Sequence, residues 1–118
     1  MTPVEGAADA FCYVTSTGRR TGRAHTIEIW FAASPAAPVL YVLTSPRSDT
    51  VANLGRRPSC TVRIGAVEHR AEARALEPGS DEDVLARRLL LAKYQSPGSS
   101  DLEHWGTSAH AIAFDLDP

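Results

Sequence analysis

The stretch that decides the fold class is Cys60-Thr-Val-Arg-Ile-Gly-Ala-Val-Glu-His-Arg-Ala-Glu-Ala-Arg-Ala-Leu76. Apolar and β-branched residues dominate 60–64, and charged residues alternate with His69 and small ones over 67–76, which is the two-residue period of a strand with one solvated face. Gly65 and Ala66 separate the two runs, and a leading glycine suits the type II′ turn of a two-residue hairpin. The stretch therefore predicts two antiparallel strands joined by a tight turn.

Further strands are predicted on both sides of this hairpin. Aromatic and β-branched residues indicate strands over 11–17, 25–33, 39–44 and 109–116. Two prolines mark 34–38 as a turn, so residues 25–44 have the pattern of a second hairpin. Hairpins join antiparallel strands, and six strands with little helix predict a small, mainly antiparallel β-barrel that closes its own edges.

Two helices complete the predicted order of elements. Ser48 can cap a short helix over 49–54, with Gly55 as its C-terminal stop. Ser80 precedes three acidic residues that suit the positive end of a helix dipole, and they begin a longer helix that ends at 96–98.

Length and composition set the broad class. A chain of 118 residues with 43% hydrophobic and 22% charged residues predicts one domain over 1–118, and we expect the polar residues 1–10 to be flexible. The net charge of −2 argues against a nucleic-acid partner, and no apolar run reaches the length of a membrane span. Cys12 and Cys60 lack metal-type spacing, and the N-terminus lacks signal-peptide features, so we expect free thiols and a cytoplasmic location.

The segment Thr15-Ser-Thr-Gly-Arg-Arg-Thr-Gly-Arg23 is the first candidate site. Its two glycines permit a tight turn, two arginines stand at the apex, and hydroxyl groups lie on both sides. Guanidinium forks, hydroxyls and backbone amides together make a cradle for an anion. An exposed, solvated hairpin loop explains the same residues equally well.

The segment 44–48, which leads into the predicted short helix, is the second candidate site. Ser45, Arg47 and Ser48 surround a helix N-terminus, where backbone amides are unpaired. A capped surface helix is the alternative interpretation of this segment alone. Two such stretches flanking one hairpin favour a ligand with several negative groups lying across the sheet. The four histidines show no metal-ligand spacing.

Two motifs in this order resemble a known family. Residues 15–31 are similar to the opening of the deazaflavin-dependent nitroreductase family, which has the pattern Thr-Thr-Gly-Arg-Lys/Arg-Ser-Gly-Arg-Pro. Residues 49–65 resemble its segment Trp-x-x-Asn-Leu followed by Asn-Pro-x-Val-x-Val. The resemblance extends over residues 11–95. It implies a six-stranded antiparallel split β-barrel of the FMN-binding type, a homodimer, and coenzyme F420 as the cofactor.

The resemblance also implies a function and a set of site residues. The function is hydride transfer between the deazaflavin and a small electron-poor acceptor such as a quinone, an enone or a nitro compound. Ser45 would hydrogen-bond near the cofactor ring, and Tyr94 would donate a proton on the substrate side. The implied cofactor-binding residues are Thr17, Gly18, Arg19, Arg20, Thr21, Gly22, His25, Thr26, Ser45, Pro46, Arg47 and Asn53.

The chain departs from the family pattern at several positions. Thr50 stands near the usual tryptophan, Ala24 replaces a proline, His25 stands where many members have arginine, and the tyrosine-rich substrate wall is reduced to Tyr94. These departures leave two alternatives open: an FMN-dependent reductase, and a split barrel that binds a flavin or deazaflavin without catalysis.

Overall fold

The structure, a computed structural model, describes residues 4, 6–45, 47–94 and 109–117. The described chain forms seven strands and two helices. In chain order they are β1 (Cys12–Thr17), β2 (Ala24–Ile29), β3 (Ala32–Ala33), β4 (Val39–Thr44), α1 (Asp49–Arg56), β5 (Ser59–Ile64), β6 (Val67–Ala75), α2 (Asp81–Tyr94) and β7 (His110–Leu116).

All seven strands belong to one sheet in the order β2-β1-β5-β6-β7-β4-β3, and every neighbouring pair is antiparallel. The predicted hairpin over 60–76 is confirmed as β5 and β6, with Ile64 opposite Val67. Gly65 has a φ of +58°, and no described residue other than glycine has a positive φ. A positive φ at the first turn residue alone is the type II′ arrangement that the sequence predicts.

The prediction of six strands is wrong, because the predicted strand over 25–33 divides into two. Residues Ala24–Ile29 pair with β1, whereas Ala32 and Ala33 pair with β4 at the opposite end of the strand order. Of the predicted 25–44 hairpin, only Ala32 and Ala33 therefore pair with the strand over 39–44. The alternation of side chains continues through the change of partner, so the sequence pattern does not reveal it.

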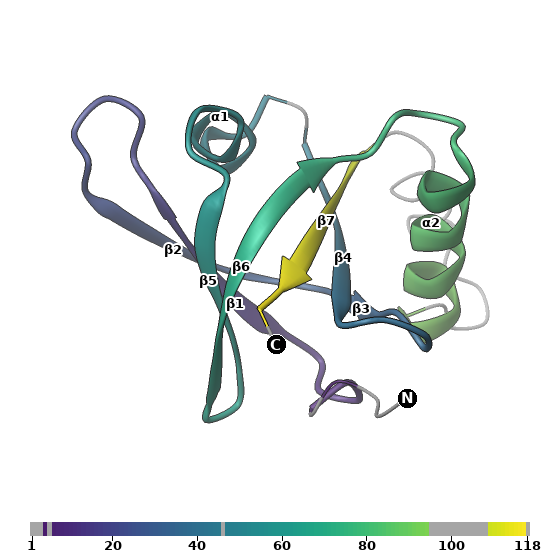
Figure 1. Cartoon of the computed structure of the whole chain (residues 1–118). Helices are drawn as coiled ribbons and strands as arrows, with labels where there is room; N and C mark the ends of the chain where they lie inside the picture. Colours follow the sequence, from purple (N-terminus) through teal and green to yellow (C-terminus); the bar gives the residue numbers. More distant parts are fainter. Residues whose placement is uncertain (1–3, 5, 46, 95–108, 118) are drawn as a thin grey trace.

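The same break gives the sheet its shape. Trp30 and Phe31 alone connect β2 to β3, which are the two outermost strands of the sheet. Because two residues cannot span a flat sheet of seven strands, the sheet curls until its edges approach each other. The result is a half-barrel, in which β2 and β3 follow one long path across the molecule (Figure 1).

The main hydrophobic core fills the inside of this curl. Cross-strand pairs such as Val14 with Val62, and Leu40 with Phe114, place buried side chains on the same inner face. Phe31, from the β2–β3 connection, is fully buried in this core. Leu54 of α1 also packs there, so α1 covers one end of the half-barrel.

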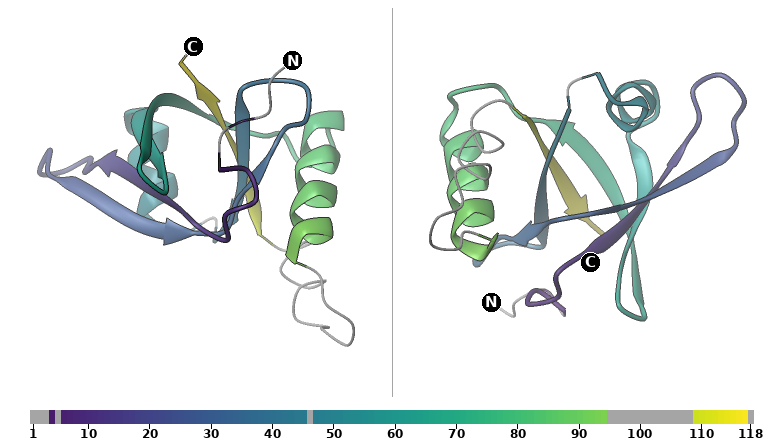
Figure 2. Two further views of the ribbon diagram at one scale, coloured as in Figure 1. Left: turned by 90° about the horizontal axis from the view of Figure 1, so that it is seen from below. Right: turned by 180° about the vertical axis from the view of Figure 1, so that it is seen from behind.

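A second apolar cluster lies on the outer face of the sheet. α2 packs its Ala86 and Leu90 against Tyr41 and Leu43 of β4 and Ala111 of β7. Figure 2 shows α2 on one side of the molecule, away from α1 and from the loop between β1 and β2. Among the described residues, no helix covers the outer face of β1, β2, β5 and β6.

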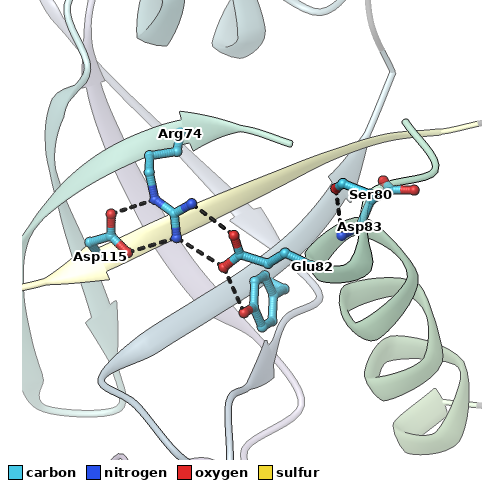
Figure 3. A network of polar contacts seen from close by, with 6 residues as sticks. Arg74, Ser80, Glu82, Asp83 and Asp115 are labelled. Atoms are coloured by element: carbon cyan, nitrogen blue, oxygen red, sulfur yellow. Dashed lines mark hydrogen bonds and ion pairs between the residues drawn. The ribbon is translucent and has the colours of Figure 1, made fainter. Parts of the chain in front are cut away.

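Arg74 of β6 links α2 to the sheet through two carboxylates (Figure 3). Its guanidinium donates to both carboxylate oxygens of Glu82 at 2.8 and 2.9 Å, and to both of Asp115 at 2.6 and 3.0 Å. The Tyr41 hydroxyl donates to Glu82 at 2.9 Å. The network therefore joins β4, β6, β7 and α2.

The ends of α1 correct a second prediction. Ser48 caps the helix as expected, because its hydroxyl accepts a hydrogen bond from the Val51 amide at 3.2 Å. Gly55, however, lies inside the helix, which continues through Arg56. The helix ends because Arg57 is extended, with φ −136° and ψ 94°, and a residue that precedes a proline disfavours the helical conformation.

The start of α2 is confirmed, since the Ser80 hydroxyl accepts from the Asp83 amide at 3.2 Å (Figure 3). Its predicted end at 96–98 lies outside the described residues. At the N-terminus, Val4 packs against the core, and Ala7 accepts a hydrogen bond from Lys93 at 3.0 Å. In the described parts of the chain, neither helix has the length and hydropathy needed to cross a membrane.

Both cysteines are free thiols and lie well apart. The β1–β5 register pairs Val14 with Val62, which places Cys12 opposite Ile64 and Cys60 opposite Ser16. Four residues along a strand span about 13 Å, so the two thiols cannot form a disulfide in this fold. Burial raises the pKa of Cys12 to about 12 and that of Cys60 to about 11, which leaves both unreactive near neutral pH.

Candidate functional site

The loop between β1 and β2 is a tight turn held by its own backbone. The Gly18 amide donates to the Arg23 carbonyl at 2.7 Å, and the Gly22 amide donates to the Gly18 carbonyl at 2.9 Å. Gly22 has a φ of +73°, a conformation that residues with a side chain rarely adopt. A Cβ on Gly18 would stand 2.8 Å from Nε2 of His25, so only glycine lets that ring lie against the loop.

One arginine of this loop is bound to α1. The backbone amide of Arg19 donates to Oδ1 of Asn53 at 3.1 Å, and its guanidinium donates to the same oxygen at 2.9 Å. The guanidinium also forms a longer ion pair with Asp49 at 3.4 Å. Asn53 is only 2% exposed, so a buried amide on the helix fixes the position of the loop.

The loop and the helix enclose a pocket of ≈ 330 Å³. Its lining residues are Gly18, Arg19, Arg20, Thr21, Arg23, His25, Asp49 and Asn53. Arg20 and Arg23 are exposed, and their guanidinium groups hydrogen-bond to no residue that the structure describes. With three arginines and one carboxylate, the pocket carries net positive charge and suits a phosphate or carboxylate group.

The pocket brings together six of the predicted cofactor-binding residues, all from the loop, the start of β2, and α1. They are Gly18, Arg19, Arg20, Thr21, His25 and Asn53. Gly22 shapes the turn without lining the pocket. Thr17 lines a different depression, of ≈ 530 Å³, over the outer face of β1, β5 and β6. Thr26 lies on that outer face too, where its hydroxyl is 2.8 Å from that of Thr15.

Two residues of the pocket were absent from the predicted set. Arg23 belongs to the quoted motif and lies one residue past Gly22, so its position in the motif could have identified it as a site residue. Asp49 carried no such signal, because an acidic residue in the first turn of a helix is common and stabilises the helix dipole. Only the docking of the loop on α1 shows that its carboxylate faces Arg19.

The two serines of the segment before α1 accept hydrogen bonds from nearby backbone amides. The Ser45 hydroxyl accepts from the Arg47 amide at 3.4 Å, and the Ser48 hydroxyl caps the helix. Ser45 and Arg47 are exposed and do not line the pocket beside the β1–β2 loop. Pro46 lies outside the described residues. The helix reaches that pocket through Asp49 and Asn53 rather than through the residues that precede it.

Tyr94 lies at the end of α2, away from the pocket. Its hydroxyl is 2.7 Å from the Ala10 carbonyl and 2.9 Å from the Phe31 carbonyl, and it accepts from the Phe31 amide at 3.0 Å. Its ring stacks on Trp30 with centroids 4.5 Å apart. Burial raises the pKa of the Tyr94 hydroxyl, although the Phe31 backbone partly offsets this. The hydroxyl thus ties the β2–β3 connection to the helix.

An apolar cleft of ≈ 280 Å³ borders α1 on β6 and β7. Small residues leave this space open: Ala73 and Ala75 line its floor, and a Cβ added to Gly55 would meet no atom within 4 Å. His110 is the one titratable residue in its lining. Among the described residues, no group of three or more His, Cys, Asp and Glu side chains could hold a metal ion.

Comparison with known proteins identifies the fold. No family model and no curated protein sequence matches the chain. Among solved structures, the heme storage protein HutZ from Vibrio cholerae has a TM-score of 0.77 at 11% identity, covering 97% of this chain and 87% of that one. An F420-H2 dependent reductase, FDR-A, has a TM-score of 0.71 at 16% identity, covering 92% and 95%. The chain has the split-barrel fold.

Solved split barrels of similar shape are described with different ligands. A FAD-binding protein from Mesorhizobium loti has a TM-score of 0.70 at 13% identity, covering 95% of this chain and 82% of that one. The predicted likeness to F420-dependent split-barrel proteins is therefore confirmed at the level of the fold. Because the three split barrels differ in ligand, the shared fold does not indicate which ligand this chain binds.

Proposed function

We propose that this split barrel binds coenzyme F420 and transfers a hydride between the deazaflavin and a small electron-poor organic acceptor. The acceptor class is a quinone, an enone or a nitro compound. The observation that carries the proposal is a pair of guanidinium groups on one pocket, those of Arg20 and Arg23, which have no partner among the described residues. The fold supports it, since an F420-H2 dependent reductase of similar shape covers nearly the whole chain.

The pocket fits the anionic part of such a cofactor. A space of ≈ 330 Å³ is at the low end for ligand pockets, so it holds a phosphate or carboxylate group rather than a whole deazaflavin. Arg20 and Arg23 would bind that group, with Thr21 as an additional hydroxyl donor. When bound, the reduced deazaflavin supplies the hydride, and the chain's own role is to orient it and exclude water.

A direct binding measurement tests the proposal. The fluorescence of F420 is followed while purified protein is added, for the wild type and for Arg20→Ala. We expect micromolar binding by the wild type and a loss of about tenfold in the variant, since a charge-assisted bidentate contact disappears. Arg88→Ala is the matched control, because Arg88 is an exposed arginine on α2 outside the pocket. Equal affinity for all three proteins, or no binding, contradicts the proposal.

FMN provides the comparison ligand. FMN has a single phosphate, whereas F420 carries a phosphate and an oligoglutamate tail. If Arg20 and Arg23 contact different anionic groups, F420 binds more tightly than FMN, and Arg23→Ala reduces that preference. Tighter binding of FMN identifies the protein as an FMN-dependent split barrel instead.

One observation favours a second function, binding without catalysis. The Tyr94 hydroxyl, the predicted proton donor, is held among backbone atoms of Ala10 and Phe31. A donor so engaged is poorly placed to protonate a substrate. A turnover assay with quinone and nitro acceptors separates the two functions, because a storage or sensing protein binds F420 and reduces none of them.

We also propose that the split barrel acts as a cytoplasmic homodimer. The outer face of β1, β2, β5 and β6, which neither α1 nor α2 covers, leaves room for a second copy. Light scattering of the purified chain gives the mass directly, and a mass of 12.7 kDa contradicts the dimer.

A further inference from the structure

The three arginines of the β1–β2 loop have different surroundings, although the sequence presents them as one cluster. Arg19 is part of a hydrogen-bonded unit, with two bonds to Oδ1 of Asn53 and one ion pair to Asp49. Arg20 and Arg23 have no such partners among the described residues. The family motif does not distinguish these three arginines, whereas their contacts in the structure do.

We propose that Arg19 and Asn53 are positioning residues that anchor the loop to α1, and that ligand affinity depends on this anchor while, of the three loop arginines, only Arg20 and Arg23 bind the anion. The inference rests on the proposed function for its affinity part. Its structural part, the anchoring of the loop, stands independently of any ligand.

The geometry of Asn53 supports the anchor. Asn53 is 2% exposed, and its single amide oxygen accepts from both the backbone and the side chain of Arg19. A buried acceptor that loses its donors is costly, so the bond pair is expected to persist. The residues are 34 positions apart in sequence, and the anchor therefore connects the tip of the β1–β2 hairpin to a helix across the end of the half-barrel.

The connection matters because, among the described residues, the loop is otherwise held by its own turn and by the β1–β2 pairing at its base. Within it, Gly18 bonds Arg23 and Gly22 bonds Gly18, which fixes the turn but not its direction. The exposed residues 20–26 make no hydrogen bond to the described residues of α1, whereas Arg19 does. Without the anchor, Arg20 and Arg23 would no longer face Asp49 and Asn53 across one pocket.

The anchor is tested first without ligand, by limited digestion with trypsin. The chain offers cleavage sites after Arg19, Arg20 and Arg23. Arg19→Met removes the guanidinium bonds, and we expect cleavage after Arg20 and Arg23 to accelerate about fivefold or more as the loop opens locally. Arg19→Lys, which keeps one donor, restores slow cleavage. Arg20→Met is the matched control, with cleavage after Arg23 at the wild-type rate.

Affinity for F420 then separates anchoring from direct contact. Asn53→Leu removes the acceptor of both Arg19 hydrogen bonds, whereas the charge of the Arg19 guanidinium stays in place. If Arg19 anchors the loop, F420 binding weakens about tenfold; if Arg19 itself binds the anion, the freed side chain maintains or strengthens binding. Asn53→Asp, which keeps an acceptor of the same shape, retains slow cleavage. Because Asn53 is buried, Asn53→Ala, which also removes the acceptor and leaves the Arg19 charge in place, supplies the same comparison should Asn53→Leu fail to fold.

The outcomes are distinguishable. Faster cleavage in Arg19→Met with rescue in Arg19→Lys supports the anchor, even if F420 does not bind and the proposed function fails. Cleavage at the wild-type rate in Arg19→Met overturns it. Unchanged or tighter F420 binding by folded Asn53→Leu overturns the positioning role while leaving the proposed function intact.

Discussion

Arg74 and Arg20 show how differently one residue type is used in this molecule. Arg74 stands on β6 between two carboxylates, and its guanidinium makes four hydrogen bonds within 3.0 Å. Arg20 stands at the tip of the β1–β2 hairpin, and no described carboxylate pairs with it. The first arginine connects structural elements, whereas the second faces a pocket.

The difference lies in the local balance of charge. Around Arg74, two carboxylates outnumber one guanidinium, so its donors are satisfied internally. Around the loop, the pocket has three guanidinium groups and one carboxylate, that of Asp49, which lies 3.4 Å from Arg19 and has an 88% exposed side chain. An unbalanced group of arginines attracts an external anion, and a balanced one stabilises the fold.

The largest expected effect comes from removing Arg74. Arg74→Met leaves Glu82 and Asp115 without their donor and facing one another. Because these groups are partly exposed, we expect a loss of about 1–2 kcal/mol in the free energy of unfolding, measured in urea. Arg70→Met, on the same face of β6, is the control and should change it by less than about 0.5 kcal/mol. Equal losses would contradict the comparison.

A smaller effect follows from removing the one carboxylate of the pocket. Asp49→Asn eliminates a negative charge beside the proposed anion site, and we expect F420 to bind about twofold to fivefold more tightly at low salt. The gain should shrink as ionic strength rises, since exposed charges are screened. Asp81→Asn on α2 serves as the charge-matched control. Weaker binding by Asp49→Asn would show that Asp49 contributes to the site.

The smallest effect is on acid stability. Hydrogen bonds from Arg74 lower the pKa of the Glu82 carboxyl. Burial alone would raise the pKa of Asp83, but bonds from Arg87 and the Gly79 amide lower it on balance. Both groups thus bind protons more weakly when folded, so their stabilisation is complete above the unfolded pKa of ~4 and is lost as pH falls through the lower folded pKa.

Urea unfolding at a series of pH values measures this acid dependence. In Arg74→Met, the contribution of the Glu82 carboxyl to this acid dependence disappears. The free energy of unfolding therefore decreases less steeply as the pH falls than it does in the wild type. Arg20→Met leaves the slope unchanged, because Arg20 forms no ion pair with a described carboxylate. A steeper slope in Arg74→Met would show that other groups govern the acid transition.

Much of the fold follows from local patterns in the sequence. The β5–β6 hairpin, the Ser48 and Ser80 caps and the strands β1, β4 and β7 were predictable, since alternation, turn glycines and capping hydroxyls act over a few residues. The break at Trp30 and Phe31 was not, because their side chains continue the same alternation while the backbone changes its partner strand.

For the site, the sequence by itself determined which residues could bind an anion: the arginines and glycines of the β1–β2 loop stand together in the chain. Only the tertiary structure decided what each arginine does. Asn53 and Asp49 lie some thirty positions away, and their contacts with Arg19 exist because the half-barrel brings α1 against the hairpin. Charge that is local in sequence is visible in the sequence, whereas its neutralisation depends on long-range packing.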